Sequence, residues 1–308
     1  MTTPDSIFPL DQYHALRAGF GMFELALWSG VTFTGADRQA FLNNFCTNDV
    51  KRLEPGEHCE AFITNVKGKI LGHGLVHSRE NELVFITVPG QAPSIIAHLD
   101  RYIIREDVQL RDSTAERAYL LESGGDGAGR ELATEHWIRW RLLDTEFCGL
   151  RETTPTDLPK VKQEALTAGA VDCGEAAFNA LRIESGSPLF GVDFNADNLP
   201  QEVNRDELAI SFTKGCYLGQ QTVARIDALG HVNQTLVGVR FAGPDVPPAG
   251  LELTGSGNSA GHVTSSTFSP QLQAPLALAM VRRQWIPPGT PLESAAGPCE
   301  VVDLPVHR

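Results

Sequence analysis

The chain contains 308 residues, of which 42% are hydrophobic and 20% are charged, and its formal net charge is -13. This composition is typical of folded globular proteins and excludes a disordered or fibrous chain. Because the length exceeds that of one usual core, we expect two or three packed subdomains. The negative charge repels phosphate backbones and anionic lipid surfaces, so we expect no stable binding to nucleic acid or to a membrane.

The amino terminus and the cysteines bear on where the protein works. Residues 1–30 lack both the basic and apolar regions of a signal peptide and the Arg-rich pattern of a transit peptide. The longest apolar stretches, such as residues 274–281, are too short to cross a bilayer. Six cysteines occur without a C-x-x-C pair, which predicts reduced thiols and no metal site built from them alone. We therefore expect a cytoplasmic protein without a resident metal ion.

Residues 1–112 are predicted to form a first α/β unit. Apolar alternation and turn signals predict helices after residue 35 and over residues 93–102, and strands over residues 31–33, 60–64, 69–77, 83–88 and 108–110. This order of elements describes a sheet covered on one face by helices. The pattern favours the α+β class.

Residues 113–234 are predicted to form a second α/β unit. Strands are expected over residues 118–121, 137–143 and 147–151, and helices over residues 160–169 and 176–184. The segment 191–206 is rich in Asn, Asp and Pro, which predicts irregular structure at the surface. Loops of this length often carry function.

Residues 235–308 are predicted to form a separate, purely β unit. Short apolar runs separated by Pro and Gly turns predict strands over residues 237–241, 251–253, 261–265 and 276–282. This spacing favours a small antiparallel barrel or sandwich.

Residues 214–225, KGCYLGQQTVAR, form the most informative segment of the chain. Two glycines free the backbone around Cys216, a helix is predicted over residues 220–226, and Lys214 adds a cation nearby. A helix amino terminus and a neighbouring cation both favour the thiolate, which is the nucleophilic and metal-binding form of cysteine. We therefore name Cys216 and Lys214 as candidate catalytic residues. The alternative is a small cysteine that packs beside a tight turn.

The same segment resembles the K-G-C-Y-x-G-Q-E signature of YgfZ-type proteins in the wider glycine-cleavage T-protein superfamily, with Gln221 in place of the final Glu. Further resemblances follow the superfamily's order along most of the chain: TNDV at 47–50, LRIESGSP at 181–188, NLPQE at 198–202, GHVTS at 261–265 and SP at 269–270. The resemblance implies the T-protein fold. In that fold, ferredoxin-like α/β units and a carboxy-terminal barrel surround a central folate pocket.

The resemblance also implies a binding site for tetrahydrofolate or a one-carbon derivative. In the superfamily the acid of the L-R-x-E segment binds the pterin ring, and Glu184 is the residue that matches it. A carboxylate can accept two parallel hydrogen bonds from the pterin's amino group and ring N–H. The alternative for Glu184 is a hydrated carboxylate at a helix end. For Arg182 two roles remain open: it supports the folate pocket, or it pairs with a nearby acid. The remaining expected folate residues are Tyr217, Gln220 and Arg225.

The sequence departs from the superfamily's enzyme where that enzyme carries an aspartate pair. An acid there can orient or deprotonate the attacking amine. The matching strand, residues 67–76, has Gly72 and His73 at these positions. His73 can act as a base, although a single imidazole on a strand is more often structural. His77 lies four residues further on, roughly 13 Å away along a strand, which is too far to share a metal ion.

Three functions remain open from the sequence, and so does the question whether the protein is an enzyme. The missing acids favour a folate-binding accessory protein for iron–sulfur cluster assembly or repair, with transient client or assembly proteins and an indirect effect on tRNA-modifying enzymes. This is the interpretation we choose. The second function is a tetrahydrofolate-dependent aminomethyltransferase or demethylating transferase. The third is a non-catalytic scaffold that binds a protein partner.

Overall fold

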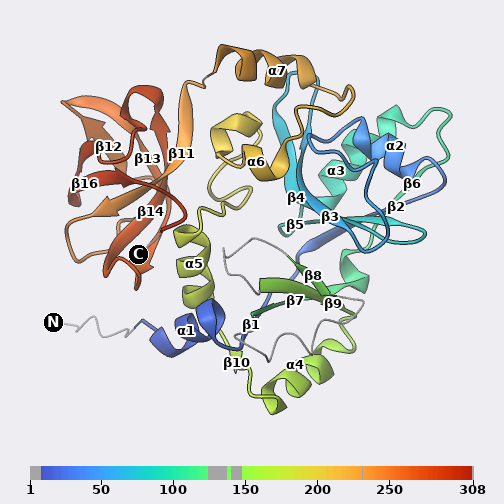
Figure 1. The fold of residues 1–308 in the computed structure, drawn as a ribbon, viewed down its shortest axis with the longest axis horizontal. Helices are drawn as coiled ribbons and strands as arrows, with labels where there is room; N and C mark the ends of the chain where they lie inside the picture. Colours follow the sequence, from blue (N-terminus) through green and yellow to red (C-terminus); the bar gives the residue numbers. More distant parts are fainter. Residues whose placement is uncertain (1–7, 124–136, 140–147, 231, 307–308) are drawn as a thin grey trace.

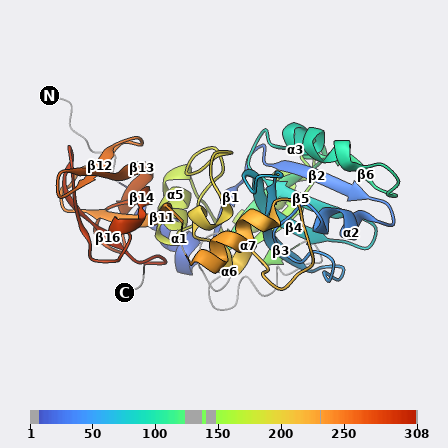
Figure 2. The ribbon, with the colours of Figure 1, turned by 90° about the horizontal axis from the view of Figure 1, so that it is seen from above.

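The structure, a computed structural model, describes residues 8–123, 137–139, 148–230 and 232–306. Figures 1 and 2 show a barrel and a first sheet at opposite ends of the molecule. Helices α1 (Leu10–Ala18), α5 (Glu175–Glu184) and α6 (Asp206–Ala209) lie between them. Within the described ranges, each helix is too short or too polar to span a lipid bilayer.

The first sheet has the strand order β3-β4-β5-β2-β6, with every neighbouring pair antiparallel. Its strands are β2 (Ser29–Thr34), β3 (His58–Thr64), β4 (Ile70–Ser78), β5 (Leu83–Thr87) and β6 (Gln109–Asp112). Helices α2 (Arg38–Asn43) and α3 (Ala92–Leu99) cover one face, where Ile63 and Phe85 share a core with Ile95. Because side chains alternate along a strand, the neighbouring positions face the other side of the sheet.

The second sheet has the strand order β10-β1-β7-β9-β8. Its strands are β1 (Gly21–Glu24), β7 (Ala118–Ser123), β8 (Trp137–Arg139), β9 (Cys148–Thr153) and β10 (Val171–Asp172). Strand β1 pairs in parallel with β10 and antiparallel with β7, so the amino-terminal segment joins this sheet although it precedes the first sheet in sequence. Helix α4 (Leu158–Thr167) covers one face, where Ala165 packs with Leu120.

The two sheets share one apolar core. Leu75 and Ile86 of the first sheet lie in the same buried cluster as Leu121 and Leu150 of the second sheet. Helices α1 and α5 close the edge of this cluster, for example through Leu16. Burial of such side chains away from water is the main favourable contribution to folding, so the two units stabilise each other.

Residues 185–233 connect the second sheet to the barrel and cross to the first sheet on the way. Their regular elements are η3 (Pro200–Val203), α6 and α7 (Gln220–Leu229). The segment 191–206, predicted to be irregular, contains only η3, the first residue of α6 and an isolated bridge between Phe190 and Phe194. The irregular structure is confirmed, but the expected surface position is wrong, because residues such as Asp193 and Glu202 are buried and Phe194 packs with Phe62 against the first sheet.

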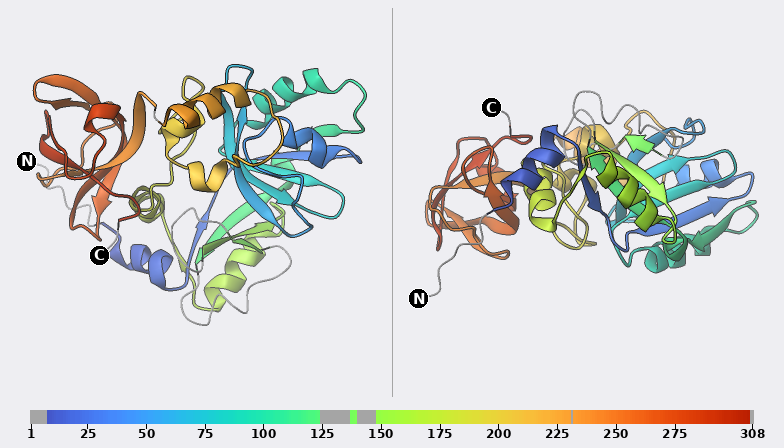
Figure 3. Two further views of the ribbon diagram at one scale, coloured as in Figure 1. Left: turned by 45° about the horizontal axis from the view of Figure 1, so that its top comes forward. Right: turned by 90° about the horizontal axis from the view of Figure 1, so that it is seen from below.

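The carboxy-terminal unit is a closed barrel with the order β11-β14-β13-β12-β15-β16. Its strands are β11 (Gln234–Phe241), β12 (Glu252–Gly255), β13 (Asn258–Ser269), β14 (Ala274–Arg282), β15 (Pro291–Ser294) and β16 (Gly297–Val302). Val239 and Val281 fill the interior, whereas Leu236 and Leu278 face outward and pack against Ile183 at the end of α5. Both views in Figure 3 show the barrel joined to the rest at α1 and α5.

The predicted α+β class and the carboxy-terminal barrel are confirmed. The predicted strands and helices of the described residues occur with shifts of a few residues, and short 3-10 turns add η1 (Asp100–Tyr102), η2 (Thr114–Glu116) and η4 (Arg283–Trp285). The expected strand over 137–143 is described only as far as residue 139, and the Gly-rich turn at 124–129 lies outside the described residues. The sequence did not predict α1, α6, β1, β10, β15 and β16.

Candidate functional site

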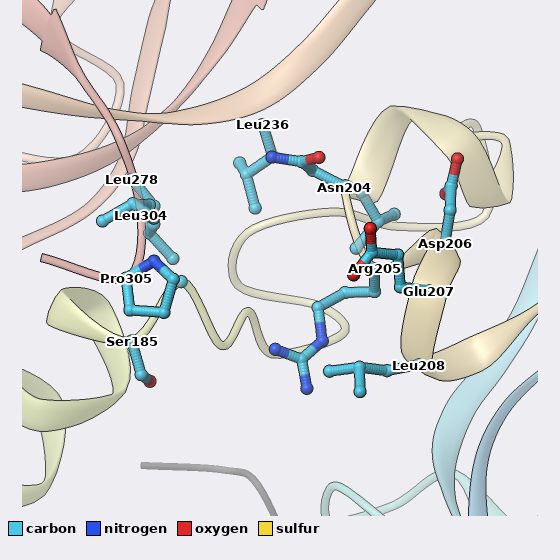
Figure 4. A pocket seen from close by; sticks show the side chains of 12 residues that line it. Ser185, Asn204, Arg205, Asp206, Glu207, Leu208, Leu236, Leu278, Leu304 and Pro305 are labelled. Atoms are coloured by element: carbon cyan, nitrogen blue, oxygen red, sulfur yellow. The ribbon is translucent and has the colours of Figure 1, made fainter. Parts of the chain in front are cut away.

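A large cavity lies between the outer surface of the barrel and the connection from α5 to α6. Its volume is about 490 Å³, and its walls are residues Ser185, Gly186, Val203, Asn204, Arg205, Asp206, Glu207, Leu208, Leu236, Leu278, Leu304 and Pro305. Figure 4 shows the apolar side chains of Leu278, Leu304 and Pro305 on one side and residues 204–208 on the other. The cavity therefore combines an apolar wall with a polar one.

A second, smaller cavity adjoins the first sheet. It is lined by Trp28, Glu60, His73, Gly74, Val88, Ser187, Pro188, Leu189 and Arg205. Arg205 lines both cavities, so the two cavities are neighbours, but the smaller one has a volume of only about 10 Å³, which is room for about one water molecule. Concave sites with apolar walls and a few convergent polar groups are the usual form of small-molecule sites. We call the two cavities together the central site.

Glu60, His73 and Arg205 form a buried charged cluster in the central site. Nε2 of His73 lies 2.7 Å from Oε1 of Glu60. Arg205 donates to the same carboxylate through two nitrogens, from Nε to Oε1 at 2.8 Å and from Nη2 to Oε2 at 2.6 Å. The side chains are 7–9% exposed. This bidentate pairing is the strongest common form of a hydrogen-bonded ion pair.

The surroundings of Glu60 keep its carboxylate ionised. Burial alone would raise the pKa of Glu60, but the charge and hydrogen bonds of Arg205, together with the hydrogen bond of His73, lower the pKa to about 2. An ionised carboxylate only accepts hydrogen bonds. Glu60 is therefore a fixed negative charge behind the imidazole.

The pairing of two strands places this cluster. In the β3–β4 register Phe62 lies opposite His73, and Glu60 shares the face of Phe62 because it is two residues away. The ring of Phe62 stacks on the imidazole with centroids 4.6 Å apart, and Phe194 contacts its edge at 5.5 Å. The imidazole is thus held between two aromatic rings and a carboxylate.

The two positions that match the superfamily's aspartate pair face opposite sides of β4. His73 faces the central site, whereas Gly72 faces α3, where an added Cβ would lie 2.8 Å from the side chain of Ile95. A side chain at position 72 would therefore enter the core and not the cavity. Of the two positions, position 73 alone can supply a group to a ligand there.

Sequence reasoning did not identify Glu60 and Arg205. The two residues are 145 positions apart, and nothing local links them. One signal was available, because Glu60 is a carboxylate on the same face as Phe62 within the mostly apolar run of residues 59–63. A carboxylate at an inward position of such a strand indicates a buried partner.

Lys214 is buried in a cage of carbonyl groups. Its ammonium group donates to the backbone oxygens of Asn43 at 2.7 Å, Cys46 at 2.8 Å and Asn48 at 2.7 Å. Burial lowers the pKa of Lys214, although the neighbouring Cys46 opposes this. The carbonyls belong to the end of α2 and the turn after it, so Lys214 ties the segment 214–225 to the first unit.

The other residues of the segment 214–225 lie apart from the central site. Cys216 is exposed, Tyr217 is buried with its ring 5.1 Å from the ammonium group of Lys214, and Arg225 is exposed on α7. Gln220 is the first residue of α7. The two cavity walls contain none of these side chains. The catalytic assignment of Cys216 and Lys214 and the folate assignment of Tyr217, Gln220 and Arg225 stay predictions.

Glu184 joins α1, α5 and the barrel. One carboxylate oxygen accepts from the hydroxyl of Tyr13 at 2.7 Å and from Arg17 at 3.0 Å. The other accepts from the hydroxyl of Ser269 and from the backbone N–H of Gln271. Glu184 is therefore buried and saturated with protein donors, unlike the hydrated carboxylate considered from the sequence. A pterin that bound it would have to displace one of these donors.

Arg182 pairs with an acid, which is one of the two roles considered for it. Its Nη1 donates to Oδ2 of Asp193 at 2.9 Å, and its Nε donates to Asn179 at 2.6 Å. The other oxygen of Asp193 accepts from the hydroxyls of Thr264 and Ser265. Asp193 thus connects the LRIESGSP and GHVTS segments. The described residues contain no group of three or more His, Cys, Asp and Glu side chains arranged for a metal ion.

The fold and the sequence both define a class of protein. The model of the GCVT N-terminal domain matches residues 8–129, and the model of the glycine cleavage T-protein C-terminal barrel domain matches residues 234–307. Together they cover well over half of the chain. The structure superposes on aminomethyltransferase T of the glycine cleavage system from Bartonella henselae with a TM-score of 0.84 and 21% identity, over 96% of this chain and 88% of that one. The chain belongs to the glycine-cleavage T-protein superfamily.

Curated relatives match nearly the whole chain. The aminomethyltransferase of Nostoc sp. is 25% identical over 96% of this chain and 87% of its own length. The aminomethyltransferase of Chlorobium chlorochromatii is 27% identical over 91% of this chain and 84% of its own.

These relatives correct the function that we chose from the sequence. An accessory role in iron–sulfur cluster assembly or repair is contradicted, because the relatives that match nearly the full length are named aminomethyltransferases. The second sequence-based alternative, a one-carbon transferase, fits these relatives better. The interpretation from the sequence rests on the YgfZ-type signature and on the missing aspartate pair, and neither of these reveals the buried carboxylate that pairs with His73.

Proposed function

We propose that this protein is a tetrahydrofolate-dependent one-carbon transferase of the aminomethyl type, which moves a methylene-level carbon between an amine donor and a reduced folate. The observation that carries the proposal is the buried His73–Glu60 pair in the central site, in a chain similar to aminomethyltransferases over nearly its full length. Reactions of this kind need a proton acceptor beside the attacking amine. The central site provides an imidazole for this purpose.

The dimensions and chemistry of the large cavity suit a folate. A volume of about 490 Å³ lies in the usual range for drug-sized ligands, roughly 300–1,000 Å³. Leu278, Leu304 and Pro305 form an apolar wall that suits a flat ring system. Arg205 lines this cavity and also the small cavity that His73 lines. A folate in the large cavity whose reacting nitrogen lies near Arg205 would lie beside the small cavity that His73 lines.

Arg182 and Glu184 enter this proposal as residues that shape the cavity wall. Ser185 and Gly186, which follow Glu184 directly, line the large cavity, and the contacts of Glu184 hold the barrel against them. Direct contact between Glu184 and the pterin remains a prediction from the resemblance. We further propose that the partner is a reduced folate in the cytoplasm, that the domain boundaries fall near residues 112 and 234, and that the chain is of the YgfZ type.

The proposal is tested by calorimetric titration with tetrahydrofolate and its one-carbon derivatives, followed by an assay for methylene-folate from aminomethyl donors. The Leu208→Trp variant fills the large cavity and is expected to lose at least tenfold in folate affinity. Leu27→Trp is the matched control, because Leu27 is 80% exposed and lies outside both cavity walls. Wild-type protein that binds no folate, or equal affinity in both variants, would contradict the proposal.

A further inference from the structure

We infer that His73 is the proton acceptor of the central site, that Nδ1 is the accepting atom, and that Glu60 and Arg205 are positioning residues that fix this tautomer. The inference rests on the proposed function only for the identity of the group that gives up the proton. The tautomer itself is a property of the free protein. It can therefore be tested without a substrate.

The hydrogen bond between His73 and Glu60 assigns the hydrogen to Nε2. A neutral imidazole carries one N–H, and its other nitrogen holds a lone pair. Since the ionised carboxylate of Glu60 can only accept, the atom 2.7 Å from it, Nε2, must donate. Nδ1 is then the basic nitrogen of the ring.

Nδ1 has no protein hydrogen-bond partner among the described residues, and His73 forms part of the wall of the smaller cavity. Nδ1 is not one of the buried polar atoms that lack a partner, so it remains accessible to a water molecule or to a ligand group. A ligand in the cavity can satisfy it. The aromatic contacts of Phe62 and Phe194 restrict rotation of the ring, so this nitrogen keeps its direction.

Arg205 completes the arrangement by holding Glu60. The guanidinium group binds both carboxylate oxygens, which fixes the plane of the carboxylate toward Nε2. The charges of Glu60 and Arg205 cancel while His73 is neutral. When His73 takes up a proton, the carboxylate lies against the new imidazolium and stabilises it, as an acid does behind the histidine of a catalytic triad. The cluster is therefore suited to a histidine that changes charge during a reaction.

The proton step balances without an oxidant or a reductant. The folate amine nitrogen attacks the methylene carbon of the donor, a new C–N bond forms, and the bond from that carbon to its leaving group breaks with the electron pair on the leaving group. The N–H bond of the attacking amine breaks, and the proton bonds to Nδ1 of His73. It then passes to the leaving group, which restores the neutral imidazole.

The tautomer is tested by long-range proton–nitrogen correlation spectra of the full-length protein labelled with ¹⁵N. The His73 signals are identified by their absence in a His73→Asn variant. We expect the shift pattern of an Nε2–H tautomer in the wild type, and a rise in the Nδ1–H population in Glu60→Gln, because an amide can donate to Nε2. A purely structural role of Glu60 would leave the tautomer unchanged. An Nδ1–H pattern in the wild type overturns the inference without any use of variants.

Kinetics test the role of the accepting atom separately. We expect His73→Asn to lower the transfer rate by about 10²- to 10⁴-fold with folate affinity retained, which is the usual range for loss of a general base. An unchanged rate would overturn the inference. Absence of turnover in the wild type, together with the Nε2–H pattern, would instead contradict the proposed function and still support Nδ1 as the basic atom.

Discussion

Nη1 of Arg182 lies 2.9 Å from Oδ2 of Asp193, and both side chains are buried at the junction between α5 and the barrel. Asp193 also accepts from two hydroxyl groups of β13, so one carboxylate connects a helix, the loop after it and the barrel. This connection holds the barrel in the position where it forms one wall of the large cavity. The segments around Arg182 and Thr264, which resemble the superfamily in sequence, thus connect α5 to the barrel.

Removing the charge of Asp193 tests this connection between α5 and the barrel. In Asp193→Asn the buried guanidinium of Arg182 loses its counter-charge, and breaking such a pair from one side destabilises by about 3–5 kcal/mol. We expect the midpoint of urea denaturation to fall accordingly. Asp197→Asn is the matched control, because Asp197 is exposed in the same loop, and its change is expected within about 0.5 kcal/mol. Equal effects of the two substitutions would contradict the assigned role.

Much of the fold follows from local patterns, whereas the missed elements lack them. The strands around Phe62 and Phe85 are runs of five or more residues rich in apolar, β-branched and aromatic side chains, which is a local pattern typical of a buried strand. In contrast, β1 has four residues and β10 has two, and both become strands only by pairing with segments far away in the chain. Their conformation is set by tertiary contacts that no local window contains.

The residues of the candidate site also differ in whether they could be predicted from the sequence. Position 73 was singled out by the resemblance, because it matches the superfamily's aspartate pair, although a single imidazole on a strand is more often structural. Its partners were not visible, because Glu60 and Arg205 meet through strand pairing and through a loop of irregular structure. The segment 214–225 stands out in the sequence for its glycines and its cysteine, yet Lys214 and Tyr217 are buried away from both cavity walls. A conspicuous segment can therefore be a structural one.

Lys214 and Cys216 are predicted to differ sharply in their effect on stability. Lys214→Met leaves three carbonyl groups without their charged donor, and we expect a loss on the order of 3 kcal/mol. Cys216→Ser changes an exposed side chain and is expected to stay within about 0.5 kcal/mol of the wild type. Thermal and urea denaturation of both variants measure the difference. Stability retained in Lys214→Met would show that the carbonyl cage does not need its cation.

Glu184→Gln separates support of the cavity wall from direct contact with a folate. The amide has one acceptor oxygen where the carboxylate has two, so one pair of donors loses its partner. We expect a loss of stability of roughly 1–3 kcal/mol and less than a twofold change in the folate affinity of the folded protein. Denaturation and calorimetry on the same preparation provide both values. A large loss of affinity with little loss of stability would instead establish the pterin contact that the resemblance implies.

The pH dependence of stability reports on the charge of Glu60. Because its pKa in the folded protein is lowered from 4.5 to about 2, its ionised form stabilises the fold above pH 4.5, and this contribution disappears as the pH falls toward 2. The corresponding free energy is on the order of 3 kcal/mol, from about 1.4 kcal/mol for each pH unit. Glu60→Gln lacks this titration. The difference in free energy of unfolding between wild type and Glu60→Gln should therefore narrow as the pH falls from about 4.5 toward 2. A difference that stays constant down to pH 3 would mean that Arg205 and His73 do not hold Glu60 in its charged form.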